Sequence, residues 1–237
     1  MCANKKILLD IGHGGKESGA VNSHSREADL NLIVGLEVDR LLKNQGFITM
    51  LSRNANVDVT LDNRCQTANN WKADLFVSIH HNAYDGKADG YGIECSIHGG
   101  VGRELAGYIA TEFEKIGQNK AMGVYSREHP TMKGKDYLKT IRDTTMPAIT
   151  TEFCFMDSPD FSIVDTLDEQ RLEARAIFNA ILKLYEFEWA IAKNVYYKTM
   201  STPTYWEQNA IAGGTCKGEY VKQYIANVAY LLKSKEG

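Results

Sequence analysis

Apolar runs and amphipathic stretches alternate along most of the chain. Short apolar runs, which are typical of buried strands, occupy residues 5–12, 47–52, 75–80, 91–98 and 146–155. Apolar residues recur at helical spacing between these runs, over residues 27–44, 64–71, 101–116 and 166–184. The alternation predicts an α/β fold, in which a twisted, mostly parallel sheet carries helices on both faces.

Local signals mark the ends of two of these helices. Gly46 follows the helix predicted over 27–44 and favours its termination. The tetrapeptide Thr166-Leu-Asp-Glu169 is a capping-box pattern at the start of the helix predicted over 166–184.

The pattern weakens after residue 187. Residues 188–217 mix aromatic and turn residues, and residues 218–237 show helical periodicity again. We therefore expect one main domain over residues 1–187 and a small C-terminal helical tail over residues 188–237. The tail is short for an independent domain.

Composition excludes several classes of partner. The formal net charge of the 237 residues is −3, and the basic residues are dispersed, which argues against nucleic acid as a partner. No apolar stretch approaches the roughly 20 residues of a membrane span.

The N-terminal residues lack the pattern of a signal peptide, so synthesis in the cytoplasm is expected. Five widely spaced cysteines indicate free thiols rather than a disulfide framework.

Polar and ionisable residues end three of the predicted strands. These strand ends are Asp10-Ile-Gly-His13, Ser78-Ile-His80 and Thr151-Glu152. Ligands of parallel α/β sheets bind at the carboxyl ends of the strands. The sequence therefore predicts that these side chains converge on one site.

Four of the ionisable residues fit a catalytic zinc site. His13, between glycines, and His80, at a strand end, supply two imidazoles, and Glu27 opens the first helix. Two histidines and one glutamate are a known catalytic zinc set with a fourth position open. Glu152 offers a general base or acid. By itself this pattern leaves other interpretations open: a loop histidine, a carboxylate at a helix N-terminus, and a solvated carboxylate.

The order of the motifs resembles one known family. LLDIGHGGKESGAV with READLNL, LSRNANVDVTLDNRCQTANN, ADLFVSIHHNA, YGIE, and YLKTIRDTTMPAITTEFCFMDSPDF resemble the successive motifs of the zinc-dependent N-acetylmuramoyl-L-alanine amidases, the amidase_3 family. The resemblance covers about residues 5–187. It implies an amidase_3-like catalytic domain over residues 1–187, and its specificity comes from five ordered motifs at consistent spacing.

The resemblance implies roles for individual residues. His13, Glu27 and His80 correspond to the ligands of one zinc ion, and Glu152 corresponds to the catalytic carboxylate. Ile11 stands where the family usually has proline, and Cys154 where it often has glycine. Neither departure touches the ligand set.

Other residues near these motifs are candidates for substrate contact. They are His81, which occupies a variable position of the family motif, Asn82, and Arg142, which could meet substrate carboxylates. Side chains alternate along a strand, so His81 is expected to face away from the metal or to lie at the rim of the site. Arg53 and Arg64 are expected in structural ion pairs.

The resemblance implies hydrolysis of the amide between N-acetylmuramic acid and L-alanine in peptidoglycan, and hence cell-wall lysis or remodelling. A phage endolysin, released to the wall by a holin or another route, is the leading expectation. A bacterial autolysin or sporulation amidase, another zinc peptidoglycan peptidase, and a non-catalytic wall-binding protein are the alternatives. The tail over 188–237 could bind the wall, pack on the main domain, or mediate homo-oligomer formation.

Overall fold

The computed structural model describes the backbone of residues 5–199 and the side chains of residues 5–185. The chain divides into two compact units, residues 1–184 and residues 185–237. The terminal helix predicted over residues 218–237 lies outside the described residues, and the predicted division at residue 187 stays a prediction, as do the roles suggested for the tail.

The first unit is built on one sheet of six strands. In chain order these are β1 (Lys6–Ile11), β2 (Ile48–Leu51), β3 (Leu75–Asn82), β4 (Tyr91–Cys95), β5 (Lys120–Tyr125) and β6 (Ala148–Phe155). Their order across the sheet is β2-β1-β3-β6-β4-β5. All neighbours are parallel except β4 and β6. The predicted α/β class and mostly parallel sheet are therefore confirmed.

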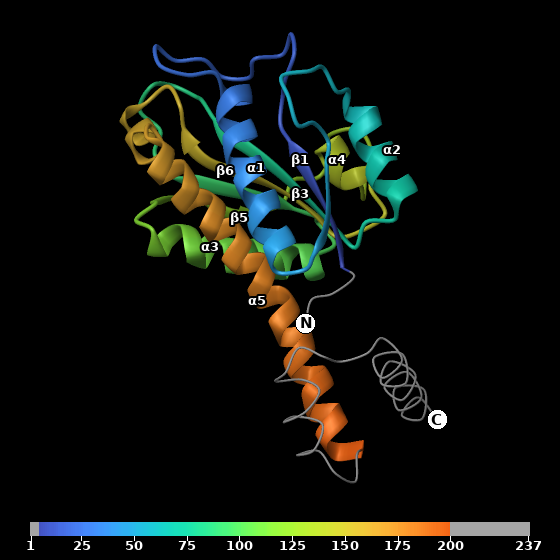
Figure 1. Cartoon of the computed structure of the whole chain (residues 1–237). Coiled ribbons are helices and arrows are strands. Elements are labelled where there is room, and N and C mark those ends of the chain that lie inside the picture. The colour runs from blue at the N-terminus through green and yellow to red at the C-terminus, as the bar shows by residue number, and fades with distance from the viewer. Residues whose placement is uncertain (1–4, 200–237) are drawn as a thin grey trace. The chain divides into compact units, whose positions relative to one another are not determined.

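Helices cover both faces of this sheet. They are α1 (Glu27–Asn44), α2 (Leu61–Trp71), α3 (Val101–Lys115), α4 (Lys139–Arg142) and α5 (Leu167–Thr199), with a 3-10 turn, η1 (Pro159–Ile163). Figure 1 shows α1, α3 and the first part of α5 on one face, with α2 and α4 on the other. No helix among the described residues is long and apolar enough to cross a membrane.

The antiparallel pairing of β4 with β6 follows from the short connection before β4. Only residues 83–90 join β3 to β4, and no helix lies between the two strands. A parallel crossover needs a longer connection, so the chain re-enters the sheet from the edge at which it left. As a result Gly92 of β4 lies opposite Glu152 of β6.

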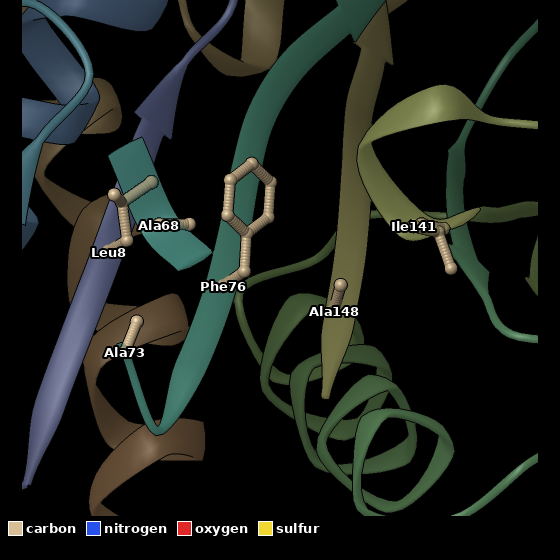
Figure 2. Close-up of a cluster of buried hydrophobic side chains, with 6 residues drawn as sticks. All are labelled: Leu8, Ala68, Ala73, Phe76, Ile141 and Ala148. Atoms are coloured by element: carbon tan, nitrogen blue, oxygen red, sulfur yellow. The ribbon is translucent and has the colours of Figure 1, made fainter. Parts of the chain in front are cut away.

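The face under α2 and α4 changes from apolar to polar along the strands. At the amino ends, Leu8, Phe76 and Ala148 share one register level and pack with Ala68 of α2 and Ile141 of α4 (Figure 2). Residues two positions further along each strand point to this same face.

Polar residues occupy the next level of that face. They are Asp10, Ser78, Thr150 and Glu94, one from each of four neighbouring strands. The level after that contains His80 and Glu152. The apolar core therefore supports a polar row, and the polar row supports the candidate site at the carboxyl edge.

The structure corrects several predicted boundaries. The strand β5 and the short helix α4 carry no clear periodic pattern, because β5 is a partly exposed edge strand with a glycine inside it. The helix α2 begins at Leu61 rather than at residue 64. Thr60 caps this helix by accepting from the Asn63 N–H.

The capping box at Thr166 and Glu169 is confirmed by two reciprocal bonds of 2.9 and 3.3 Å. The predicted free thiols are confirmed for Cys65, Cys95 and Cys154.

Candidate metal centre and active site

Three strands and one helix bring the predicted site residues to one edge of the sheet. The strands β1, β3 and β6 are parallel neighbours, so their carboxyl ends lie side by side. His13 follows the end of β1, while His80 and Glu152 pair with each other across β3 and β6. Glu27, the first residue of α1, completes the group.

The side chains of His13, Glu27 and His80 form a close cluster. The Nε2 atom of His13 lies 3.0 Å from Oε2 of Glu27, and Nδ1 of His80 lies 2.9 Å from Oε1 of the same carboxylate. One nitrogen or oxygen from each residue lies within 4.8 Å of the others. Two imidazoles and a carboxylate so placed could hold a metal ion, since ligand atoms around a tetrahedral zinc lie roughly 3.3 Å apart.

The loop that carries His13 is held by arginines from two other segments. His13 has a φ of 57°, a left-handed conformation that is uncommon for a residue with a side chain. Arg64 donates to the carbonyl of His13 over 2.8 Å, and Arg53 donates to the carbonyl of Gly12 over 2.8 Å. These bonds satisfy buried carbonyls and hold the loop in a conformation that the sequence alone would not favour.

Gly12 leaves the space that His80 occupies. An ideal Cβ atom at residue 12 would lie 2.3 Å from Cε1 of the His80 ring, much closer than atoms can approach. The position of the His80 ring therefore requires a glycine before His13.

In this cluster, the contacts between Glu27 and the histidines favour the charged forms of Glu27 and His80. Burial of Glu27 opposes its ionisation, but the hydrogen bonds from His13 and His80 outweigh burial and hold the pKa of Glu27 well below its usual range. Burial likewise works to lower the pKa of His80, but the Glu27 hydrogen bond and the Glu152 charge raise it overall. The carboxylate is therefore ionised, as a metal ligand must be.

Glu152 stands apart from this cluster in its electrostatics. Burial raises its pKa to about 7, and the charge of Glu27 acts in the same direction. Its Oε2 atom is buried and has no hydrogen-bond partner among the described residues. A carboxyl group whose pKa lies near neutrality at a strand end suits a general acid or base.

The polar row beneath the site is tied together by ion pairs at both ends. Arg64 lies 2.5 Å from Asp10, which also accepts from the Ser78 hydroxyl over 2.7 Å. At the other end Arg127 lies 2.5 Å from Glu94. The predicted ion pair of Arg64 is confirmed. The side chain of Arg53, in contrast, donates hydrogen bonds to backbone carbonyls.

The structure corrects the position predicted for His81. Its side chain points away from the cluster, as strand alternation predicts, but it is buried and does not lie at the rim. Its ring nitrogens contact Asn31 of α1 and Glu173 of α5 instead. The His81 side chain has no exposed surface, so its burial argues against the suggested substrate contact, which stays a prediction.

The other two candidates for substrate contact lie at opposite ends of the sheet. Asn82 ends β3, and its side-chain oxygen accepts from the next backbone N–H, of Ala83, over 2.9 Å. Arg142 ends α4 near the start of β6, where it donates to the carbonyl of Tyr137 over 2.8 Å. Four residue steps along β6, from Ala148 to Glu152, separate that end from the site by about 13 Å. Substrate contact by Asn82 and by Arg142 stays a prediction.

Sequence reasoning missed Asn31 and Glu173. Asn31 lies four residues after Glu27 and therefore on the same side of α1. That spacing could have identified it. Glu173 carried no comparable signal, because only tertiary packing brings α5 against β3.

Comparisons with known proteins agree with this arrangement. A family model described as N-acetylmuramoyl-L-alanine amidase (Amidase_3) matches residues 7–183. The N-acetylmuramoyl-L-alanine amidase CwlM of Bacillus licheniformis is 33% identical over 180 residues, which cover 75% of this chain and 64% of that protein. The endolysin of Bacillus phage SPP1 is 34% identical over 164 residues, which cover 66% of this chain and 57% of that protein.

A solved structure shows the same likeness. Cwp6 from Clostridium difficile has a TM-score of 0.74 and 28% sequence identity, over 78% of this chain and 30% of that one. The chain spans less than two thirds of the length of both curated relatives named above.

Proposed function

The chain belongs to the Amidase_3 family of N-acetylmuramoyl-L-alanine amidases, and on that premise we propose that it hydrolyses the amide bond between N-acetylmuramic acid and L-alanine in peptidoglycan. The observation that carries this proposal is the cluster of His13, Glu27 and His80 with Glu152 beside it at one sheet edge. Peptidoglycan is accordingly the partner, and the proposed outcome is lysis or remodelling of the cell wall.

The proposed cofactor is one zinc ion held by His13, Glu27 and His80. The donor set fits zinc, which binds imidazole nitrogen and carboxylate oxygen in catalytic sites with three protein ligands. A zinc ion bound there supplies a Lewis acid, which polarises the substrate carbonyl and lowers the pKa of water. The three residues would hold the zinc ion, and the hydrogen bonds that Glu27 accepts keep the Glu27 carboxylate in place.

Glu152 moves the proton in the proposed reaction. Water adds to the lactyl carbonyl carbon, and Glu152 accepts the proton that the water loses. The carbon–nitrogen bond then breaks, and Glu152 returns the proton to the leaving nitrogen of L-alanine. A pKa near 7 lets one carboxyl group accept and donate in turn. The products are a free lactyl carboxylate and a stem peptide with a free amino terminus.

The proposal concerns the bond that is cleaved, and it applies equally to a phage protein and to a bacterial one. One relative is named an endolysin of a phage and another a bacterial amidase. Both names support action on the cell wall, in a phage lysin or in a bacterial autolysin or sporulation amidase.

Mass spectrometry of digested cell wall tests the proposal against its alternative. Intact stem peptides that begin with a free L-alanine are expected, together with glycan that has lost its stems. Stems shortened from within would instead indicate another zinc peptidoglycan peptidase. Undigested wall would indicate a non-catalytic wall-binding protein.

A further inference from the structure

The carboxylate of Glu27 is held by donors from three segments besides the two histidines. The backbone N–H of Ala20 donates to Oε2 over 2.9 Å. Oε1 accepts from the backbone N–H of His81 over 3.2 Å and from the Asn31 side chain over 3.3 Å. The carboxylate therefore has a fixed orientation before any metal binds.

The amide of Asn31 is itself oriented by its surroundings. Its Nδ2 group donates to Glu27 and to the carbonyl of Gly12, the latter over 3.2 Å. Its Oδ1 atom lies 2.7 Å from Nδ1 of His81, so the imidazole acts as the donor in that bond. If the amide turned over, both of its ends would lose their partners. His81 thus selects the orientation in which the Asn31 NH₂ group faces Glu27.

The ring of His81 is held in turn by α5. Its Nε2 atom lies 3.0 Å from Oε2 of Glu173, and both side chains have no exposed surface. The remaining carboxylate oxygen, Oε1 of Glu173, is buried without a partner among the described residues. Burying such a pair is costly, and apolar side chains of similar size would fill the space between α5 and β3 without that cost.

We propose that Glu173, His81 and Asn31 are positioning residues for Glu27, so that α5 helps to set the metal affinity of the site. The inference rests on the proposed function insofar as Glu27 is taken as a zinc ligand. None of the three residues needs to touch the metal or the substrate. They act in series: Glu173 orients His81, His81 orients Asn31, and Asn31 orients the carboxylate.

Zinc affinity, measured on the metal-free full chain by competition with a chromophoric chelator, tests this proposal. The double variant His81→Leu/Glu173→Leu removes both polar partners at once, a change that can leave stability nearly unaltered. We expect zinc binding at least about tenfold weaker than in the wild type, as is typical when a residue supporting a metal ligand is lost. Glu173→Gln keeps an acceptor for His81 and should retain affinity within about threefold.

Tyr91→Phe is the matched control. Its hydroxyl donates to Glu114 of α3 over 2.7 Å, and the residue is buried on the same face of the sheet as His81. Among the described residues, this hydroxyl bonds to Glu114 and not to Glu27. Tyr91→Phe should therefore bind zinc like the wild type, whatever it does to the melting temperature.

Asn31→Ala provides a second variant that does not depend on the folding of the double variant. It should also weaken zinc binding about tenfold, and adding the His81 and Glu173 changes to it should weaken binding no further, because the residues act in series. Wild-type zinc affinity in either Asn31→Ala or a folded double variant would overturn the proposal. Failure of the wild type itself to bind zinc would contradict the proposed function instead.

Discussion

His80 and Glu152 face each other across β3 and β6, at one register level of two parallel strands. Their side chains therefore leave the sheet on the same face, and the two residues differ sharply in their other contacts. His80 bonds to the Glu27 carboxylate, whereas one buried oxygen of Glu152 has no hydrogen-bond partner within the described part of the chain. The pairing places a metal-ligand candidate beside a carboxyl group of raised pKa.

Glu152→Gln should abolish most of the activity and leave zinc binding intact. Glutamine cannot accept and return a proton, and general acid–base catalysis contributes about 10²–10⁴-fold. Turbidity loss of purified cell walls measures the rate, and metal analysis of the same sample measures zinc content. A variant that clears walls at the wild-type rate would exclude Glu152 from the proton transfer.

Glu152 should also make the metal-free protein less stable as the pH rises from about 4.5 to about 7. Its folded pKa of about 7 exceeds its ordinary value of 4.5, so the folded state retains a proton that the unfolded chain releases. That stabilisation is complete below pH 4.5 and is lost as the pH rises through 7. The stability of Glu152→Gln relative to the wild type should therefore increase over this interval, by about 3 kcal/mol at most.

Chemical denaturation of both metal-free proteins at several pH values measures this difference. The comparison cancels the titration of the groups that the two proteins share. A difference that stays constant between pH 4.5 and 8 would show that Glu152 is not desolvated in the folded protein.

Removal of zinc with a chelator should abolish wall digestion and lower the melting temperature. Zinc that binds only the folded state stabilises it by about 2.7 kcal/mol at a free concentration of 100 times Kd. Adding zinc back should restore both properties in the wild type. His80→Ala, which lacks one proposed ligand, should show neither effect, and a zinc-dependent melting temperature in that variant would remove His80 from the ligand set.

Gly12→Ala should disturb the metal centre although residue 12 carries no functional group. The added methyl group would overlap the ring of His80, so the ring or the loop must move. We expect weaker zinc binding by competition titration. Gly107→Ala in α3 is the control, because open space surrounds residue 107 and alanine there should stabilise the helix by about 0.5–1 kcal/mol. Equal zinc affinities of the two variants would contradict the steric argument.

Arg64→Ala should destabilise the protein far more than loss of a surface arginine. Arg64 is buried and bonds to Asp10 and to the carbonyls of Ile11 and His13. Breaking such a buried pair costs about 3–5 kcal/mol, because the partner charge is left uncompensated. The pair of the exposed Arg40 with the half-buried Glu37 lies at the surface and contributes about 0–1 kcal/mol, which makes Arg40→Ala the control. Denaturant unfolding measures the free energy of unfolding of both variants. Similar decreases would argue against the idea that Arg64 holds the His13 loop in place.

Much of the fold was predictable because its signals are local. Buried strands such as β1 and β3 are continuous apolar runs, and α1 shows a clear apolar stripe. The edge strand β5 was missed because it is half exposed and is paired on one side only, so its residues alternate weakly. The antiparallel direction of β4 depends on where the chain re-enters the sheet, which periodicity does not report.

For the site, the sequence by itself determined which residue types end the strands, and hence that His13, His80 and Glu152 would meet at one edge. Parallel strands bring their carboxyl ends together whatever their side chains are. Tertiary structure alone decided how the Glu27 carboxylate is oriented and what His81 does. That histidine was expected to face away from the metal or to lie at the rim, and it is buried between α1 and α5, against Asn31 and Glu173. Such contacts join residues 50 and 92 positions apart, and no local pattern records them, because they depend on how two helices pack on the same face of the sheet.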